Sequence, residues 1–194
     1  MNIMSMRALA AFVSLLAVLL VTAVACGDDS TSEPNGGPPA VSRFDNADTE
    51  PKGRSIEGLF EPMTLGRSDP ADMGSFSRMS FYFIERIPNY QVRYIEEPTF
   101  CGSGGRVAMD GDSFLQVTFT PARAHDDAGV QSHALSASDA DAMPAVADIV
   151  QTCDFEGQLT FVFGLEESDV PFRTNFLTEI GLIETVAIDI QNPD

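Results

Sequence analysis

Basic residues are scarce in this chain of 194 residues. It has 11 lysines and arginines against 29 aspartates and glutamates, so its net charge is −18 at pH 7. A surface of this kind repels phosphate backbones and anionic headgroups, and the sequence therefore predicts that the protein does not bind nucleic acid. The plainest reading of the charge is that it keeps an exported protein soluble and free of non-specific contacts.

Histidine is also scarce, and the motifs of common catalytic sites are missing. The two histidines, His125 and His133, both lie in a loop-rich region. A Ser-His-Asp site needs a base aimed at a nucleophile, and the sequence has no nucleophile elbow. Residues 102–105 (GSGG) lack the lysine and the helix that a phosphate-binding loop needs. We therefore expect no enzyme, and an uncharacterised hydrolase is the third of our functional hypotheses.

Three cysteines are present, and none of them forms a C-x-x-C pair. Cys101 and Cys153 are 52 positions apart, without the close spacing of a zinc site. Thiols oxidise in the compartments that exported proteins reach, and an even pair there favours a disulfide. Two buried free thiols are the alternative.

The chain begins with a positively charged start and an apolar run. Arg7 is the only charged residue before Cys26, and residues 8–25 are almost entirely apolar. This pattern is typical of a secretory signal peptide, although the run is long enough for a marginal membrane-spanning helix. Residues 23–26 (AVAC) resemble the lipobox of bacterial lipoproteins, with alanine at a position that is usually leucine.

The lipobox resemblance implies that residues 1–25 are a lipoprotein signal peptide that is removed. Cys26 would then carry palmitate or a related acyl chain. The mature protein would be anchored to the membrane and face the outside of the cytoplasm. Its net charge would become −19, because Arg7 is lost and no acidic residue is.

Residues 26–55 are rich in Gly, Pro, Ser, Asp and Glu, and Phe44 is their only aromatic residue. Such a segment cannot bury enough apolar surface to offset the entropy lost on ordering. We expect a disordered linker with a reach of about 30 Å, estimated for a flexible chain. Residues 56–191 remain for one domain of ordinary size.

Period-two alternation dominates the domain and predicts an all-β fold. Apolar and polar residues alternate over residues 79–83, 90–94, 115–119, 159–165 and 186–190. Alternating strands with one face buried are typical of an antiparallel β-sandwich.

The longest alternating stretch makes the sharpest prediction about the core. Leu159, Phe161, Phe163 and Leu165 should face inward, and Gln158 and Thr160 should be more exposed. Asp110-Gly111 predicts a hairpin turn between Val107 and Leu115. Residues 144–151 fit a helix or a strand, and their β-branched residues favour a strand from Val146.

The order of several short segments resembles the AMIN-like domain of bacterial exported proteins. They are Arg78 with Phe81 and Phe83, then residues 87–94 (IPNYQVRY), 101–104 (CGSG), 111–115 (GDSFL), 121–125 (PARAH), 153–157 (CDFEG), 171–173 (PFR) and 186–190 (VAIDI). The chain departs from the pattern in having Phe161 where tryptophan is expected. Residues 181–185 also replace a Pro-Pro-Arg turn. Both departures look like structural exchanges.

The resemblance implies an AMIN-like β-sandwich without an established activity. Related AMIN domains help to locate envelope proteins by binding peptidoglycan or other envelope partners. We therefore expect a non-catalytic, membrane-anchored envelope binding module. Tyr82, Tyr90 and Tyr94 are the aromatic residues best suited to an exposed glycan-binding surface.

Two polar segments allow other interpretations. His125, Asp126 and Asp127 could bind a metal, with calcium favoured over zinc because acids outnumber histidines. A calcium-stabilised structural or adhesion domain is therefore the second hypothesis, although the same residues could simply form a turn. In residues 154–157 (DFEG) we expect a turn with Phe155 in the core.

Overall fold

The computed structural model describes residues 43–45, 47–49, 61–84, 86–135, 137–178 and 183–194. The chain divides into two units, residues 1–38 and 39–194, and every described residue belongs to the second. The predicted signal peptide and Cys26 lie outside the described residues. Within the described ranges, no helix has the length and apolar character needed to cross a membrane.

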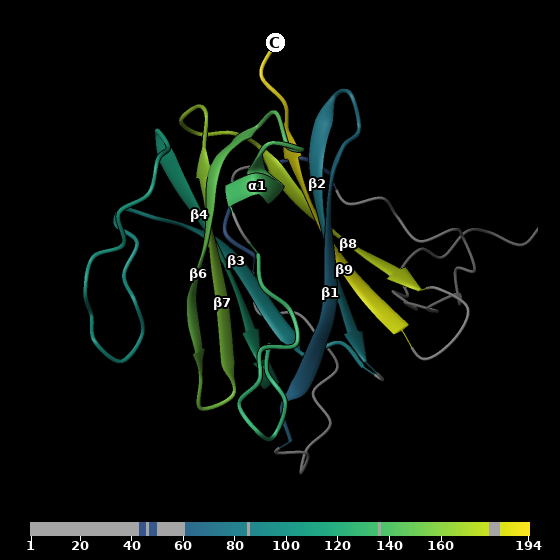
Figure 1. Ribbon diagram of the computed structural model, residues 1–194. Helices are drawn as coiled ribbons and strands as arrows, with labels where there is room; N and C mark the ends of the chain where they lie inside the picture. The colour runs from purple at the N-terminus through teal and green to yellow at the C-terminus, as the bar shows by residue number, and fades with distance from the viewer. Residues whose placement is uncertain (1–42, 46, 50–60, 85, 136, 179–182) are drawn as a thin grey trace, which may run out of the picture. The chain divides into compact units, whose positions relative to one another are not determined.

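Two β-sheets pack face to face (Figure 1). The five-stranded sheet has the order β5-β1-β2-β9-β8, and the four-stranded sheet has the order β3-β4-β7-β6. Their strands are β1 (Met63–Asp72), β2 (Phe76–Ile84), β3 (Asn89–Ile95), β4 (Ser113–Thr120), β5 (Ala122–Arg123), β6 (Val146–Phe155), β7 (Gln158–Leu165), β8 (Phe172–Thr178) and β9 (Ile183–Gln191). All neighbouring strands are antiparallel except β1 and β5. The predicted all-β sandwich is confirmed.

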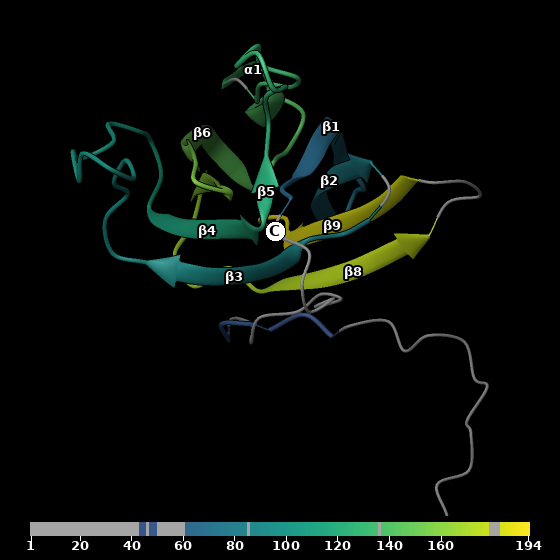
Figure 2. The same ribbon diagram turned by 90° about the horizontal axis from the view of Figure 1, so that it is seen from below.

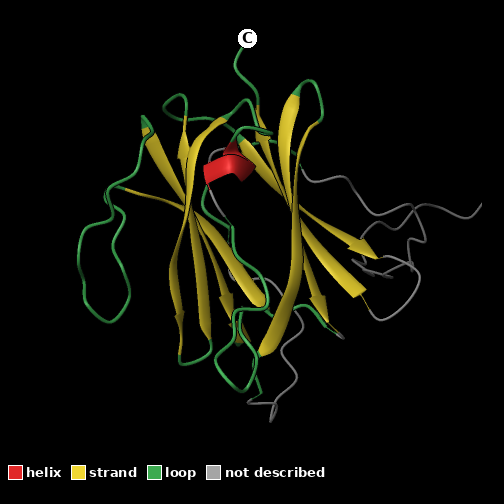
Figure 3. Cartoon of the chain, viewed as in Figure 1, coloured by secondary structure: helices red, strands yellow, loops and turns green. Residues whose placement is uncertain are grey.

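Helix is nearly absent from the described residues, as Figure 3 shows. The single turn α1 (Ala137–Ala140) precedes β6. The strand predicted from Val146 is confirmed, because β6 begins at that residue. Its β-branched side chains pack well on a pleated surface, which is why a strand is favoured over a helix here.

The core lies between the sheets and is built from the predicted alternation. Leu159, Phe161, Phe163 and Leu165 are all fully buried. The ring centroid of Phe81, on β2, lies 5.3 Å from that of Phe161, so aromatic rings join the two sheets. Burying one such side chain stabilises the fold by about 1.5–3 kcal/mol.

Two predictions about the four-stranded sheet are wrong. Thr160 is only 3% exposed, because it lies on a central strand and its hydroxyl is 3.3 Å from that of Thr118 on the adjacent strand. Gln158, at the end of the strand, is exposed as expected. Asp110-Gly111 does not join two strands, since β3 ends at Ile95 and a loop of residues 96–112 leads into β4.

Two of the three tyrosines expected on an exposed surface, Tyr90 and Tyr94, instead hold the two sheets together. Tyr90 is only 2% exposed, and its hydroxyl donates to Oγ1 of Thr174 at 3.4 Å. The hydroxyl of Tyr94 donates to the carbonyl of Val170. Burial raises the pKa of Tyr94 to about 12. These tyrosines close the side of the sandwich at which β3 lies beside β8 (Figure 2). Tyr82 is partly exposed, and the guanidinium of Arg67 lies over its ring.

Residues 43–45 and 47–49 fall within the range predicted as a tether, yet they contact the domain. Asp45 forms an antiparallel bridge with Phe172, and the amide of Thr49 donates to the carbonyl of Val92 at 2.8 Å. The average composition of residues 26–55 predicts a linker, but it does not reveal the contact that the single aromatic residue, Phe44, makes. Its ring lies 5.8 Å from that of Phe76, between centroids.

Candidate functional site

A loop between β3 and β4 is bonded to the far edge of the four-stranded sheet. Within it, residues 98–107 fold back on themselves, and the amide of Phe100 donates to the carbonyl of Gly105 at 2.8 Å. Cys101 and Cys153 form a disulfide with their Cα atoms 5.2 Å apart, as the sequence predicted. The amide of Cys101 also donates to the carbonyl of Thr152 at 3.1 Å. The tip of this loop is therefore fixed beside the end of β6.

The turn between β6 and β7 exposes a second aromatic residue. Glu156 and Gly157 both have positive φ, 48° and 75°, which is the backbone of a two-residue type I′ hairpin. Phe155 pairs with Gln158 across this turn, so both lie on the face opposite Leu159. The expected turn is confirmed, but Phe155 is 59% exposed, and its predicted place in the core is wrong.

These two features border a groove of about 320 Å³, lined by residues 100–102 and 151–155. Phe100, one of the lining residues, is 42% exposed. The disulfide forms part of the lining, so the position of Phe100 relative to Phe155 is covalently restrained. Large apolar groups exposed together are uncommon on a soluble domain and are typical of binding sites.

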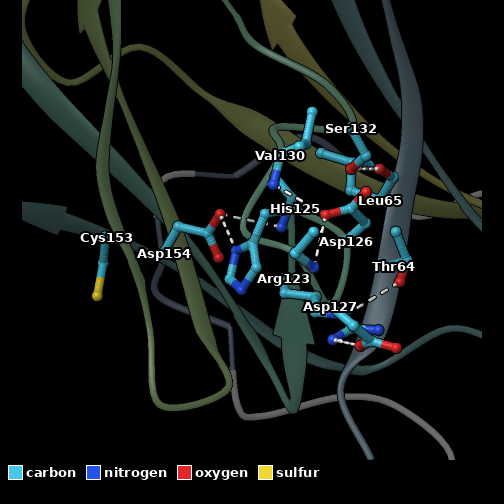
Figure 4. A network of polar contacts seen from close by, with 12 residues as sticks. Thr64, Leu65, Arg123, His125, Asp126, Asp127, Val130, Ser132, Cys153 and Asp154 are labelled. Atoms are coloured by element: carbon cyan, nitrogen blue, oxygen red, sulfur yellow. Dashed lines mark hydrogen bonds and ion pairs between the residues drawn. The ribbon is translucent and has the colours of Figure 1, made fainter.

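Asp154 precedes Phe155 on β6 and makes polar contacts on the face of the strand opposite Phe155. Oδ2 of Asp154 accepts from Nδ1 of His125 at 2.8 Å and from the amide of Ala124 at 3.2 Å. Figure 4 shows the Asp154 side chain directed toward His125 and Cys153 pointing the other way. The second carboxylate oxygen, Oδ1, is buried and has no hydrogen-bond partner among the described residues.

The three residues considered for metal binding have separate partners. Asp126 accepts from the amides of Ala128 and Val130 and closes its own turn. Asp127 pairs with Arg123 at 2.6 Å, while His125 bonds Asp154. Within the described part of the chain, no group of three or more His, Cys, Asp or Glu side chains is placed to hold a metal ion.

A second polar cluster lies on the outer face of the five-stranded sheet. Asp189 is fully buried, and Oδ1 accepts from Nε of Arg78 at 2.6 Å. Oδ2 accepts from Arg78, Arg173 and Asn175 at 2.8 to 2.9 Å. The hydrogen bond to Asp189 raises the pKa of Arg78. This carboxylate joins β2, β9 and β8 and has no oxygen left unpaired.

The segments that carry the family resemblance meet in these two places. Cys101 reaches Cys153, and His125 reaches Asp154, so three of those segments converge at the end of β6. Arg78, Arg173 and Asp189 come from three others. Sequence reasoning missed both Asp154 as the partner of His125 and Phe155 as an exposed residue. The exposed position of Phe155 follows from its pairing with Gln158 across a two-residue turn.

The AMIN-like domain family matches residues 70–192, which is more than half of the chain. No curated protein and no solved structure matches the chain. The matched range runs from β1 to just beyond β9 and contains both polar clusters. The chain therefore belongs to the AMIN-like domain family.

Proposed function

We propose that this protein is a non-catalytic binding module of the cell envelope that is anchored to the membrane and recognises peptidoglycan. The observation that carries the proposal is the groove between Phe100 and Phe155 at the end of β6. Two exposed phenylalanines held in place by a disulfide form a preorganised apolar surface. Preorganisation lowers the entropy lost on binding.

The groove has the chemistry of a surface for sugar rings. Aromatic rings contribute large contact areas, and sugar rings present apolar C–H faces that can lie against them. Polar residues, among them Gln151 and Thr152, line the groove together with the two phenylalanines. A few polar groups among apolar ones are typical of small-ligand sites.

The polar pair beside the groove has no nucleophile bonded to its histidine within the described residues. The only hydrogen bond of the His125 side chain within the described residues is to Asp154. Nucleophilic catalysis needs a hydroxyl or thiol within hydrogen-bond reach of the base. The contacts of Asp154 with His125 and Ala124 position the loop that follows β5.

Co-sedimentation with purified sacculi tests the binding surface. The full chain in mild detergent should sediment with sacculi, and a double Phe100→Ala, Phe155→Ala variant should bind at least tenfold more weakly. Phe176→Ala is the matched control, because Phe176 is a comparably exposed phenylalanine (51%) on β8 of the other sheet. Equal binding by both variants would place the ligand on another surface, and no sedimentation of the wild type would contradict the proposal.

The anchor is proposed to be lipid on Cys26, which lies outside the described residues. Two acyl chains hold a protein stably at a membrane, whereas one does so only marginally. Cys26→Ala should block acylation and prevent normal cleavage of residues 1–25, so the variant should be larger than the wild type. Wild type and variant of equal size and equal solubility in detergent fractionation would contradict lipidation.

A further inference from the structure

The described residues 43–45 and 47–49, here called the strap, follow the side of the sandwich at which β3 and β8 are neighbours (Figure 2). At β8, the amide of Asp45 donates to the carbonyl of Phe172 at 3.0 Å, and the amide of Phe172 donates back at 2.6 Å. The strap therefore pairs with the edge of the five-stranded sheet as a short additional strand would.

The same segment continues to the edge of the other sheet. The amide of Val92 donates to Oγ1 of Thr49 at 2.9 Å, and the amide of Thr49 donates to the carbonyl of Val92. The amide of Tyr94 donates to Oδ1 of Asp48 at 3.1 Å. Unpaired amides on an edge strand tend to form hydrogen bonds with strands of other molecules. The strap provides hydrogen-bond acceptors for such amides on both sheets.

One aromatic side chain holds the strap to the outer face. The guanidinium of Arg173 lies 4.2 Å from the centroid of the Phe44 ring, and Phe76 lies on the same guanidinium at 4.8 Å. Arg173 is itself fixed by Asp189, which belongs to the fully paired polar cluster. Phe44 therefore docks on a rigid part of the domain.

The strap buries little of itself. Arg43, Asp45, Ala47 and Asp48 are exposed, and only Phe44 and Thr49 are partly buried. Segments with few buried apolar groups open at a lower free energy than the core does. The strap is therefore held to the domain less strongly than the core strands are held to one another.

We propose that the strap is a releasable clamp that sets how far the domain reaches from its membrane anchor. The proposal rests on the lipid at Cys26 proposed above. With the strap docked, 17 residues separate Cys26 from Arg43, which can span at most about 60 Å. With the strap released, 37 residues separate Cys26 from Met63, the first residue of β1, which raises the limit to about 130 Å.

The amides that bond the strap report its release. In Phe44→Ala combined with Thr49→Ala, the amides of Phe172, Val92 and Tyr94 should exchange hydrogen at least tenfold faster by NMR. The amides of Val117 and Ile188 on central strands should exchange at the wild-type rate. Phe176→Ala, an exposed phenylalanine lost from the same strand β8, should accelerate none of the three. Unchanged rates at the three amides, or equal acceleration at all five, would overturn the proposal.

Reach is measured on the lipidated full chain bound to a supported bilayer. Neutron reflectometry should place the domain of the double variant farther from the bilayer than that of the wild type, and an equal separation would contradict the clamp. The exchange measurement needs no membrane, so a protein that washes off the bilayer refutes the anchor and leaves the result on the strap intact.

Discussion

Two carboxylates, Asp189 and Asp154, occupy contrasting positions in the same sandwich. Asp189 lies on a central strand and accepts four hydrogen bonds from three side chains. Asp154 lies near the end of an edge strand and accepts two, both on one oxygen. Both oxygens of Asp189 bond groups on neighbouring strands, whereas one buried oxygen of Asp154 has no partner in the part of the chain that the structure describes.

The difference distinguishes a carboxylate that holds the sheet together from one that lies beside the proposed binding groove. A buried charge in the middle of a sheet persists only when it is fully paired, because an unpaired one carries a large desolvation cost. Asp189 meets that condition and also holds Arg173 beneath the strap. Asp154 lies next to the proposed binding groove, which the two exposed phenylalanines line. A disulfide and a tight turn already fix the backbone of this region.

The largest effect is expected from Asp189→Ala. It leaves the guanidiniums of Arg78 and Arg173 largely buried without their counter-charge, so it should lower the free energy of unfolding by about 3–5 kcal/mol. Urea denaturation measures this. Asp69→Ala removes an exposed ion pair with Arg67 and should cost less than about 1 kcal/mol. Equal losses from the two changes would show that Asp189 is no more structural than a surface acid.

The disulfide comes next, because it fixes the neighbourhood of Asp154 covalently. Replacing Cys101 and Cys153 by alanine opens a loop of 52 residues and should cost about 2–4 kcal/mol. Reduction of the wild type should give a similar loss in thermal or urea unfolding. A loss well under 1 kcal/mol would mean that the groove is held by packing alone.

Asp154→Ala should cost less than Asp189→Ala, about 1–3 kcal/mol, because it removes two hydrogen bonds and strands no arginine. His125→Ala should account for part of that loss, since the pair is shared. Urea denaturation of both variants and of the double variant gives the coupling between the two side chains. If Asp154→Ala destabilised the domain as strongly as Asp189→Ala, the contrast between the two carboxylates would fail.

Much of the sandwich follows from local sequence. Leu159, Phe161, Phe163 and Leu165 predict their strand and its buried face, because period-two alternation needs no long-range information. Thr160 was misplaced because its burial depends on Thr118, which is far away in sequence. Strand β1 was not predicted, since Gly66 and Pro70 are poor strand residues and pairing with β2 decides their conformation.

The site is less predictable because its contacts are non-local. The cysteine pair follows from count and compartment, without knowledge of the fold. Adjacency in the sequence groups His125 with Asp126 and Asp127, but sheet topology brings it to Asp154, 29 residues later. Side-chain chemistry alone favours a surface position for the tyrosines, and only the strand register shows that Tyr90 faces Phe119.

The smallest effect concerns His133, whose Nε2 lies 2.5 Å from Oγ of Ser68. Burial lowers the pKa of His133 below 6.5, and the charges of Asp139 and Asp69 only partly oppose this. The folded protein therefore binds a proton less readily than the unfolded chain, and stability should fall as the pH drops from about 6.5 toward the lowered pKa.

Other acid-sensitive groups act in the same range, so the informative quantity is the difference between the wild type and His133→Gln. The melting temperature of this variant should depend less on pH between about 7.5 and 5.5, because its amide can still bond Ser68 without titrating. Asp69→Asn should steepen the wild-type dependence, since it removes a charge that raises the pKa of His133. Parallel melting curves for wild type and His133→Gln would show that His133 titrates as it would in water.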